Sequence, residues 1–199
     1  MSVTQIDVLR HGQVLTPNLF CAPSTEALSQ VGWQQLTTAT RDYRPDQILS
    51  SPSARCAEFA QKFSAKAAIP LQIEARIQEM NFGNWIGKTS QAIWATDQVG
   101  LQQLWSDPLS FTAPQGESMQ AFIERVTKAW ADLTQLYAGQ RVLLITHGGV
   151  IRVLLAYSLG IGYAQTLRFE LAYGQAVRFR VYADATSSVY GLGLEQLKS

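Results

Sequence analysis

Two short apolar segments of this chain are each followed directly by a His-Gly pair. Residues 5–10 (QIDVLR) precede His11, and residues 141–146 (RVLLIT) precede His147. Both segments are short, apolar and rich in branched side chains, which predicts strands that are buried on both faces of a sheet. The chain contains no other histidine. We therefore expect both imidazoles at the ends of interior strands.

Helical patterns alternate with the predicted strands along the chain. Helices are expected over residues 28–42, from Ser51-Pro52 onward with Ser51 as the N-cap, and over residues 90–106, 118–137 and 150–159. Further strands are expected at residues 47–51, 70–75, 165–170 and 175–183, and the last dozen residues are left unassigned. This alternation predicts the α/β class, a three-layer α/β/α sandwich with a mostly parallel central sheet. The chain is expected to form a single domain over residues 1–199, with a candidate lid or insert at about residues 82–118.

Composition narrows the kinds of partner that the chain is expected to have. Hydrophobic residues make up 47% and charged residues 16%, which is typical of a compact soluble domain. The formal net charge is +1 without basic or acidic runs, so no nucleic-acid partner is expected. No apolar run approaches the ~20 residues that span a bilayer, so no membrane partner is expected. The chain has only two cysteines, and its N-terminal segment lacks a signal-peptide pattern, which together favour a cytoplasmic location. The oligomeric state stays open.

The two histidines are expected to share a ligand site. Ligands of open α/β sheets bind at the carboxyl ends of the strands, which is where His11 and His147 fall. Arg10 adjoins the first histidine, and Arg55 lies in the first turn of a predicted helix, whose N-terminus also favours an anion. Arginine matches the geometry of phosphate oxygens, and the glycines allow close approach of the backbone. Without a metal-ligand cluster, this set predicts a site for a dianionic phosphate, with no metal and no cofactor.

Four motifs in this chain resemble those of the histidine phosphatase (phosphoglycerate mutase-like) superfamily, and they occur in the family's order. They are LRHGQ (residues 9–13), SSPSARCAEFA (residues 50–60), EMNFGNW (residues 79–85) and THGGVIR (residues 146–152). One short motif occurs by chance, whereas four in order over most of the chain are specific.

The resemblance implies a two-step phosphoryl transfer. His11 would attack phosphorus and form a phosphohistidine, which water then hydrolyses. Glu79 would protonate the leaving oxygen and later activate water, and His147 would stabilise charge in the transition state. The implied phosphate-binding residues are Arg10, Arg55, His147, Gly148 and Gln13. The implied enzyme is a metal-independent phosphomonoester hydrolase that acts on a small molecule.

Several positions near the motifs depart from the family's pattern. Pro17 stands where the family commonly has an asparagine, and Asn18 is one position late. Arg152 is expected to be structural or at the surface. These departures affect positions that face the substrate more than they affect the phosphate chemistry.

The choice among activities within the family stays open. Residues 79–85, 104–108 and 114–122 look most like α-ribazole-5′-phosphate phosphatases of cobalamin biosynthesis. The alternatives are a phosphoglycerate mutase or sugar-bisphosphatase activity and a catalytically silent phosphate-binding domain. Three tryptophans, Trp85, Trp94 and Trp105, could belong to a lid over the substrate or to the core, and the core is the favoured interpretation.

Overall fold

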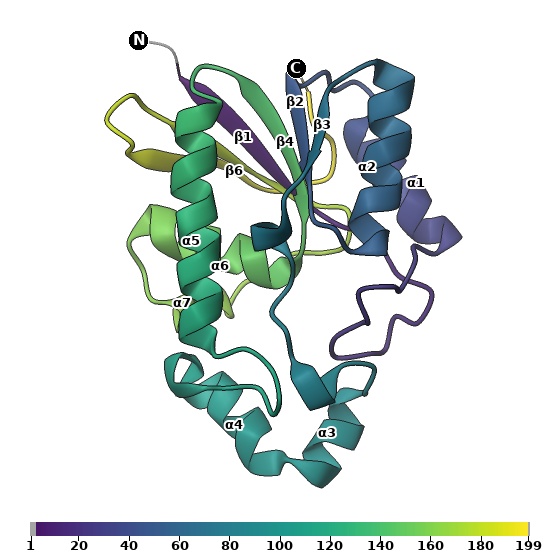
Figure 1. Ribbon diagram of the computed structural model, residues 1–199, viewed down its shortest axis with the longest axis vertical. Helices are drawn as coiled ribbons and strands as arrows, with labels where there is room; N and C mark the ends of the chain where they lie inside the picture. Colours follow the sequence, from purple (N-terminus) through teal and green to yellow (C-terminus); the bar gives the residue numbers. More distant parts are fainter. Residues whose placement is uncertain (1–2, 199) are drawn as a thin grey trace.

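A six-stranded sheet forms the centre of the computed structural model, which describes residues 3–198 (Figure 1). Its strands lie in the order β3-β2-β4-β1-β5-β6. Their bounds are β1 Thr4–Arg10, β2 Gln47–Ser50, β3 Leu71–Ile73, β4 Arg141–Thr146, β5 Ala176–Val181 and β6 Ser187–Leu194. The first four strands in this order run parallel, while β5 is antiparallel to β1 and β6 is antiparallel to β5. The predicted, mostly parallel α/β sheet is therefore confirmed.

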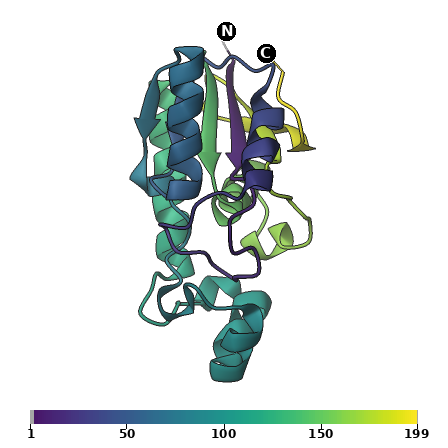
Figure 2. The same ribbon diagram turned by 90° about the vertical axis from the view of Figure 1, so that its right-hand side faces the viewer.

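Helices cover both faces of this sheet (Figures 1 and 2). The helices are α1 Gln30–Thr40, α2 Ala54–Ala67, α3 Ser90–Thr96, α4 Gln98–Ser106, α5 Met119–Leu136, α6 Gly148–Leu159 and α7 Tyr163–Thr166. Helices α1 and α2 pack on one face, α5 and α6 pack on the other, and α3 and α4 lie beyond the carboxyl ends of the parallel strands. Within residues 3–198, no helix combines the length and the apolarity needed to cross a membrane.

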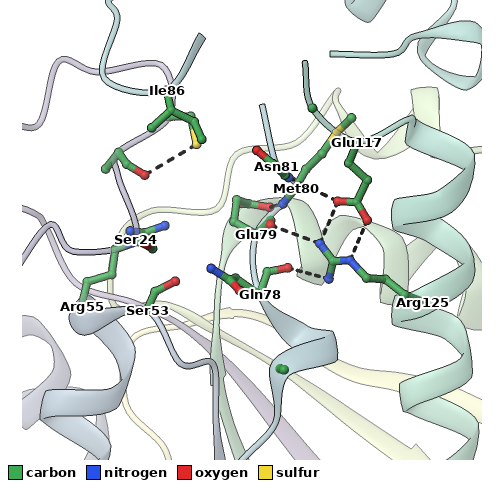
Figure 3. A pocket seen from close by; sticks show the side chains of 14 residues that line it. Ser24, Ser53, Arg55, Gln78, Glu79, Met80, Asn81, Ile86, Glu117 and Arg125 are labelled. Atoms are coloured by element: carbon green, nitrogen blue, oxygen red, sulfur yellow. Dashed lines mark hydrogen bonds and ion pairs between the residues drawn. The ribbon is translucent and has the colours of Figure 1, made fainter. Parts of the chain in front are cut away.

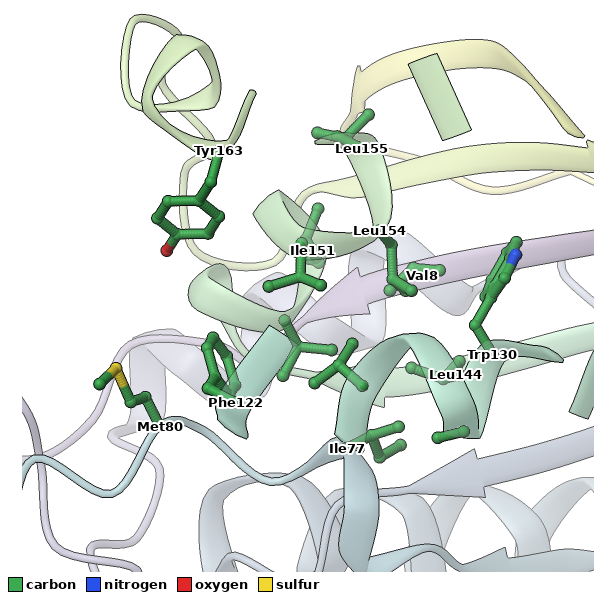
Figure 4. Close-up of a cluster of buried hydrophobic side chains, with 14 of the residues drawn as sticks. Val8, Ile77, Met80, Phe122, Trp130, Leu144, Ile151, Leu154, Leu155 and Tyr163 are labelled. Carbon is green, nitrogen blue, oxygen red and sulfur yellow. The ribbon is translucent and has the colours of Figure 1, made fainter. Parts of the chain in front are cut away.

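The interior strands divide their side chains between two hydrophobic cores. In β4, Leu143 joins the core beneath α1 and α2, whereas Leu144 joins the core beneath α5 and α6. Figure 4 shows the second core, where Leu144 and Val8 of β1 lie near Trp130 of α5 and Leu154 of α6. Because successive side chains of a strand point to opposite faces, a strand covered on both faces is largely apolar. This is why the uninterrupted apolar pattern of residues 141–146 predicted an interior strand.

Helix α2 begins later than expected. Its first residue is Ala54 and its N-cap is Ser53, so the prediction that Ser51 caps this helix was wrong. The Ser51 hydroxyl instead lies 2.8 Å from Nε2 of His147, which follows the neighbouring strand β4. Ser51 and His147 are 96 positions apart, so their contact cannot be predicted from the local sequence. The Ser51-Pro52 pair also has the residue types that commonly begin a helix.

Two further expectations were wrong in their boundaries or type. Residues 90–106 form two helices, because the Asp97 carboxylate accepts hydrogen bonds from the Gly100 N–H (3.0 Å) and from Nε1 of Trp85 (3.1 Å). Residues 165–170 form the end of α7 and a turn in place of a strand. Arg152 donates hydrogen bonds to the carbonyl oxygens of Thr166 and Phe169, which stabilises this turn.

Candidate active site

The two histidine strands are neighbours in the sheet. Strands β1 and β4 pair in parallel with Arg10 opposite Thr146, so His11 and His147 leave the sheet at the same edge. The backbone N–H of His11 donates to the Thr146 carbonyl at 2.9 Å. The two imidazole centroids are 5.2 Å apart, with an interplanar angle of 63°. The two rings are therefore neighbours, as their shared position at strand ends predicted.

Hydrogen bonding and burial set the state of His11. Its Nδ1 lies 2.8 Å from the Gly12 carbonyl oxygen, which can only accept a hydrogen bond. We therefore assign the proton to Nδ1, which leaves a lone pair on Nε2. Burial, and next the nearby charge of Arg55, lower the pKa of His11 to about 3. The imidazole is thus neutral at neutral pH, as a nitrogen nucleophile must be.

Close backbone packing holds the His11 loop in place. A Cβ atom on Gly12 would lie 2.2 Å from the carbonyl oxygen of Gly32, in α1. A Cβ atom on Gly32 would in turn lie 2.1 Å from the Gln13 carbonyl oxygen. Both positions therefore require glycine, which lets the start of α1 rest directly on the loop after β1.

His147 is fully buried and directs one nitrogen to a serine. Its Nε2 lies 2.8 Å from Oγ of Ser51, and that oxygen also accepts from the backbone N–H of Ser53 at 3.3 Å. We assign the Ser51 proton to the nearer acceptor, Nε2 of His147, in preference to Oγ of Ser53 at 3.4 Å, which places the imidazole proton on Nδ1. Burial lowers the pKa of His147 well below its ordinary value, and Arg55 lowers it further. His147 is therefore a neutral ring with Nδ1–H as a donor.

Three buried N–H groups at this end of the sheet have no hydrogen-bond acceptor among the described residues. They are Nε of Arg10, Nε of Arg55 and Nδ1 of His147. Carbonyl oxygens hold the two guanidinium groups, through Nη1 of Arg10 to Leu171 and Nη1 of Arg55 to Pro23 (2.8 Å). Buried donors are normally paired, so a convergent unpaired set indicates a site for an oxyanion.

A small inner cavity of about 80 Å³ lies beside His11, whose ring separates it from the buried ring of His147. Arg10, His11, Arg55 and Glu79 line it, together with the ring of Tyr173. Tyr173 stacks against the Arg10 guanidinium, 4.2 Å from the ring centroid, and its ring centroid lies 5.5 Å from that of His11. Tyr173 could not be predicted from the sequence, because residues 165–175 carry no motif that points to the site.

Glu79 lies where the inner cavity opens into two larger spaces. Its carboxylate accepts from the backbone N–H of Gly149 and that of Met80, both at 3.1 Å. On one side is a polar cavity of about 600 Å³, which Figure 3 shows with Arg55, Ser53 and Ser24 facing Glu79. On the other side is an apolar cavity of about 280 Å³ between α4, α5 and α7. Glu79 lines all three cavities. Its carboxylate can therefore contact a substrate group that extends from the inner cavity into either the polar or the apolar cavity.

Comparison with known proteins identifies the family of this chain. Residues 6–190 match the family model described as the histidine phosphatase superfamily (branch 1). The chain belongs to the histidine phosphatase superfamily. Among curated relatives, a bifunctional protein of Mycobacterium tuberculosis is 28% identical over 192 residues, which cover 94% of this chain and 52% of that protein. The chain therefore spans about half the length of that relative.

Three other known proteins match this chain over most of their own length. The adenosylcobalamin/alpha-ribazole phosphatase of Escherichia coli is 26% identical over 172 residues, which cover 84% of this chain and 85% of that protein. The crystal structure of the alpha-ribazole phosphatase from Shigella flexneri superposes with a TM-score of 0.86 at 22% identity, covering 98% of both chains. The structure of Bacillus stearothermophilus YhfR gives a TM-score of 0.88 at 22% identity, covering 96% of this chain and 97% of that one. These superpositions confirm the fold.

Not every residue implied by the family resemblance lies at the inner cavity. Gln13 is among the described residues, but it lines none of the three cavities; its backbone N–H donates to Gln35 at 2.9 Å. Asn18 is exposed in the loop before α1. Gly148 and Arg152 line the apolar cavity, and Arg152 has the structural role described above. The phosphate-binding roles of Gln13 and Gly148 stay predictions.

The protonation of the histidines can be measured directly, since the chain contains only two. Both have lowered pKa values, so both rings should stay neutral as the pH falls through the ordinary histidine range. We expect their imidazole C–H chemical shifts to stay constant between about pH 8 and about pH 5 in NMR spectra of the folded protein. A titration of either ring centred near the ordinary value of about 6.5 would contradict this.

Proposed function

We propose that this chain is a phosphomonoesterase that transfers a phosphoryl group to His11 and then to water. The observation that carries the proposal is a set of three unpaired buried donors around a neutral histidine. Arg10 and Arg55 line the inner cavity together with His11, and the His147 ring lies against the His11 ring. Such a set binds a phosphate and leaves a nucleophile beside it.

In the first step, the lone pair on Nε2 of His11 attacks phosphorus and the bond from phosphorus to the ester oxygen breaks. Glu79, as a carboxylic acid, gives its proton to that oxygen, so a neutral alcohol leaves. In the second step, the Glu79 carboxylate takes a proton from water as the water oxygen attacks phosphorus. The bond from phosphorus to Nε2 then breaks, which releases inorganic phosphate and regenerates neutral His11.

The positive groups carry the charge that develops during both steps. Arg10 and Arg55 provide guanidinium charge to the phosphoryl oxygens, and Nδ1–H of His147 provides a neutral donor. Because these groups are buried and held by backbone carbonyls or by Ser51, they need little reorganisation during the reaction. This mechanism requires neither a metal nor a cofactor.

For the substrate, we propose α-ribazole-5′-phosphate, a small molecule of cobalamin biosynthesis, acted on in the cytoplasm. The motifs at residues 79–85, 104–108 and 114–122 support this choice, as does the likeness to alpha-ribazole phosphatases. A phosphoglycerate mutase or sugar-bisphosphatase activity and a silent phosphate-binding domain are the competing functions.

Release of inorganic phosphate tests the proposed function. The panel contains p-nitrophenyl phosphate, α-ribazole-5′-phosphate, 3-phosphoglycerate and fructose bisphosphates, each assayed in EDTA. Release that persists in EDTA supports the phosphomonoesterase, and the preferred ester identifies the substrate. Interconversion of phosphoglycerates without net release would instead indicate a mutase, and phosphate binding without any turnover would indicate a silent domain.

Gly149 provides a test of the position of Glu79. A Cβ atom on Gly149 would lie 2.2 Å from Oε1 of Glu79, so alanine there must displace the carboxylate. We expect Gly149→Ala to lower kcat for an alkyl phosphate by about 10²-fold, since a displacement of about 1 Å is enough for such a loss. In the control, Gly148→Ala, the Cβ atom would lie 3.5 Å from Nε of Arg10, an ordinary contact, and the backbone N–H is kept. Equal losses in the two variants would argue against the placement of Glu79.

A further inference from the structure

The polar cavity beside Glu79 gives space for the alcohol part of a substrate. It shares Arg55, Glu79, Cys21 and Ala22 with the inner cavity, so a group bonded to a phosphate in the inner cavity can extend into it. Its other polar side chains are those of Ser24, Ser53, Gln78, Asn81, Glu117 and Arg125 (Figure 3). The charges and the free donors of these residues determine which alcohols it can accept.

Arg125 of α5 has no unused donor for a ligand. Its Nε and Nη2 donate to the two oxygens of Glu117 at 2.7 and 2.9 Å. Its Nη1 donates to the carbonyl oxygens of Arg76 and Gln78, both at 2.8 Å, and Nη2 also donates to the Glu79 carbonyl at 3.1 Å. A guanidinium has five N–H groups, and these five bonds use all of them. Glu117 also balances the positive charge of Arg125.

The remaining charges in the polar cavity disfavour an anion. Arg55 is the other cation among the described lining residues; it lines the inner cavity as well, where the proposed function assigns its guanidinium to the reacting phosphate. Glu79 and Glu117 both carry carboxyl groups at this cavity. A carboxylate or second phosphate on the substrate would lose hydration there, and the one cation without a paired carboxylate in the described part of the lining, Arg55, already faces the reacting phosphate. Hydroxyl groups, in contrast, can bond to the serine hydroxyls and to the side-chain amides.

The apolar cavity is no better suited to an anion. Its one cation besides Arg10, among the described residues, is Arg152, whose Nη1 already donates to two backbone carbonyls. The surrounding side chains are largely apolar, and they include Trp105, Phe122 and Tyr163. Burial of a charged group against such side chains costs free energy.

We propose, on the basis of the proposed function, that this site selects phosphomonoesters of neutral, hydroxyl-bearing alcohols over esters that carry a second anionic group. The paired state of Arg125 and Glu117 is the basis of the selection. The same pair fixes the backbone of residues 76–79 and so positions Glu79. The site therefore excludes sugar acids and bisphosphates by charge, while it accepts polyols and nucleoside-like alcohols.

A matched pair of substrates tests this selection. sn-Glycerol 1-phosphate and 3-phospho-D-glycerate have the same length and the same configuration at the secondary alcohol, but the first has a hydroxymethyl group where the second has a carboxylate. We expect kcat/KM for the glycerol ester to be about tenfold or more above that for the glycerate ester, because the carboxylate would stay unpaired. If turnover of both is slow, the same ratio can be read from their competitive inhibition constants against p-nitrophenyl phosphate.

Substitution of Glu117 tests whether the Arg125–Glu117 pair causes the preference for the glycerol ester. Glu117→Gln leaves the charge of Arg125 unbalanced, so the ratio of the two esters should fall toward one, whatever the change in absolute rate. Glu124→Gln, an exposed position on the same helix, should leave the ratio unchanged. A wild-type ratio at or below one, or a ratio unaffected by Glu117→Gln, would overturn the inference. If wild type does not hydrolyse even p-nitrophenyl phosphate, the proposed function itself fails, and the selection with it.

Discussion

Replacement of His11 with alanine is expected to lower phosphate release by about 10³-fold or more, because it removes the atom that bonds to phosphorus. The three unpaired donors stay in place in this variant, since none of them bonds to the His11 side chain. His11→Ala should therefore still bind inorganic phosphate, which calorimetry can measure beside the rate. The fold should persist, because His11 contributes a single side-chain hydrogen bond, to the neighbouring Gly12.

Loss of phosphate release together with retained phosphate binding in His11→Ala would identify His11 as the nucleophile. Loss of both activity and phosphate binding would indicate collapse of the inner cavity and leave the role of His11 undecided; His11→Asn, which keeps a polar side chain, would then be compared. Activity close to that of wild type in His11→Ala would contradict the mechanism.

Replacement of Glu79 with glutamine is expected to separate the two steps of the reaction. The change keeps the size of the side chain but removes the proton that is transferred, so turnover of an alkyl phosphate should fall by about 10²–10⁴-fold. p-Nitrophenolate leaves without a proton, so the first step with p-nitrophenyl phosphate should stay fast in this variant. The second step still lacks its base. Rapid mixing should therefore show a burst of p-nitrophenol, equal to the number of active sites, and then slow turnover.

Glu124→Gln serves as the control for Glu79→Gln, since it makes the same chemical change at an exposed position of α5. It should leave both the rate and the shape of the time course unchanged. Equal losses for the alkyl and the p-nitrophenyl ester in Glu79→Gln, without a burst, would show that Glu79 acts in neither proton transfer.

Much of the inner cavity could be predicted because its residues adjoin strong local patterns. His11 and His147 follow uninterrupted apolar strands, and Arg10 and Arg55 lie beside such a strand or in the first turn of a helix. Parallel pairing of β1 with β4 then brings the histidines together, as the shared position at strand ends indicated.

The supporting contacts could not be predicted, because they join residues that are distant in the chain and carry no motif. Ser51 meets His147 across 96 positions, and Arg125 meets the Glu79 backbone across 46 positions. From the sequence alone, a serine next to a proline suggests a helix cap, and an arginine in a long amphipathic helix suggests a residue exposed to solvent. The same reason explains the misassigned strand at residues 165–170, where Arg152 stabilises a turn that local alternation does not reveal.

The central claim is that the phosphoryl group is carried by His11, and the most direct test is to trap it there. Glu79→Gln is mixed with p-nitrophenyl phosphate and quenched in alkali, in which phosphohistidine survives, and the modified residue is located by mass spectrometry of peptides. We expect about one phosphoryl group per chain, on His11, and none in the double variant that also carries His11→Ala. Turnover by wild type without a covalent phosphoryl group in either protein, or a phosphoryl group on another residue, would contradict the account.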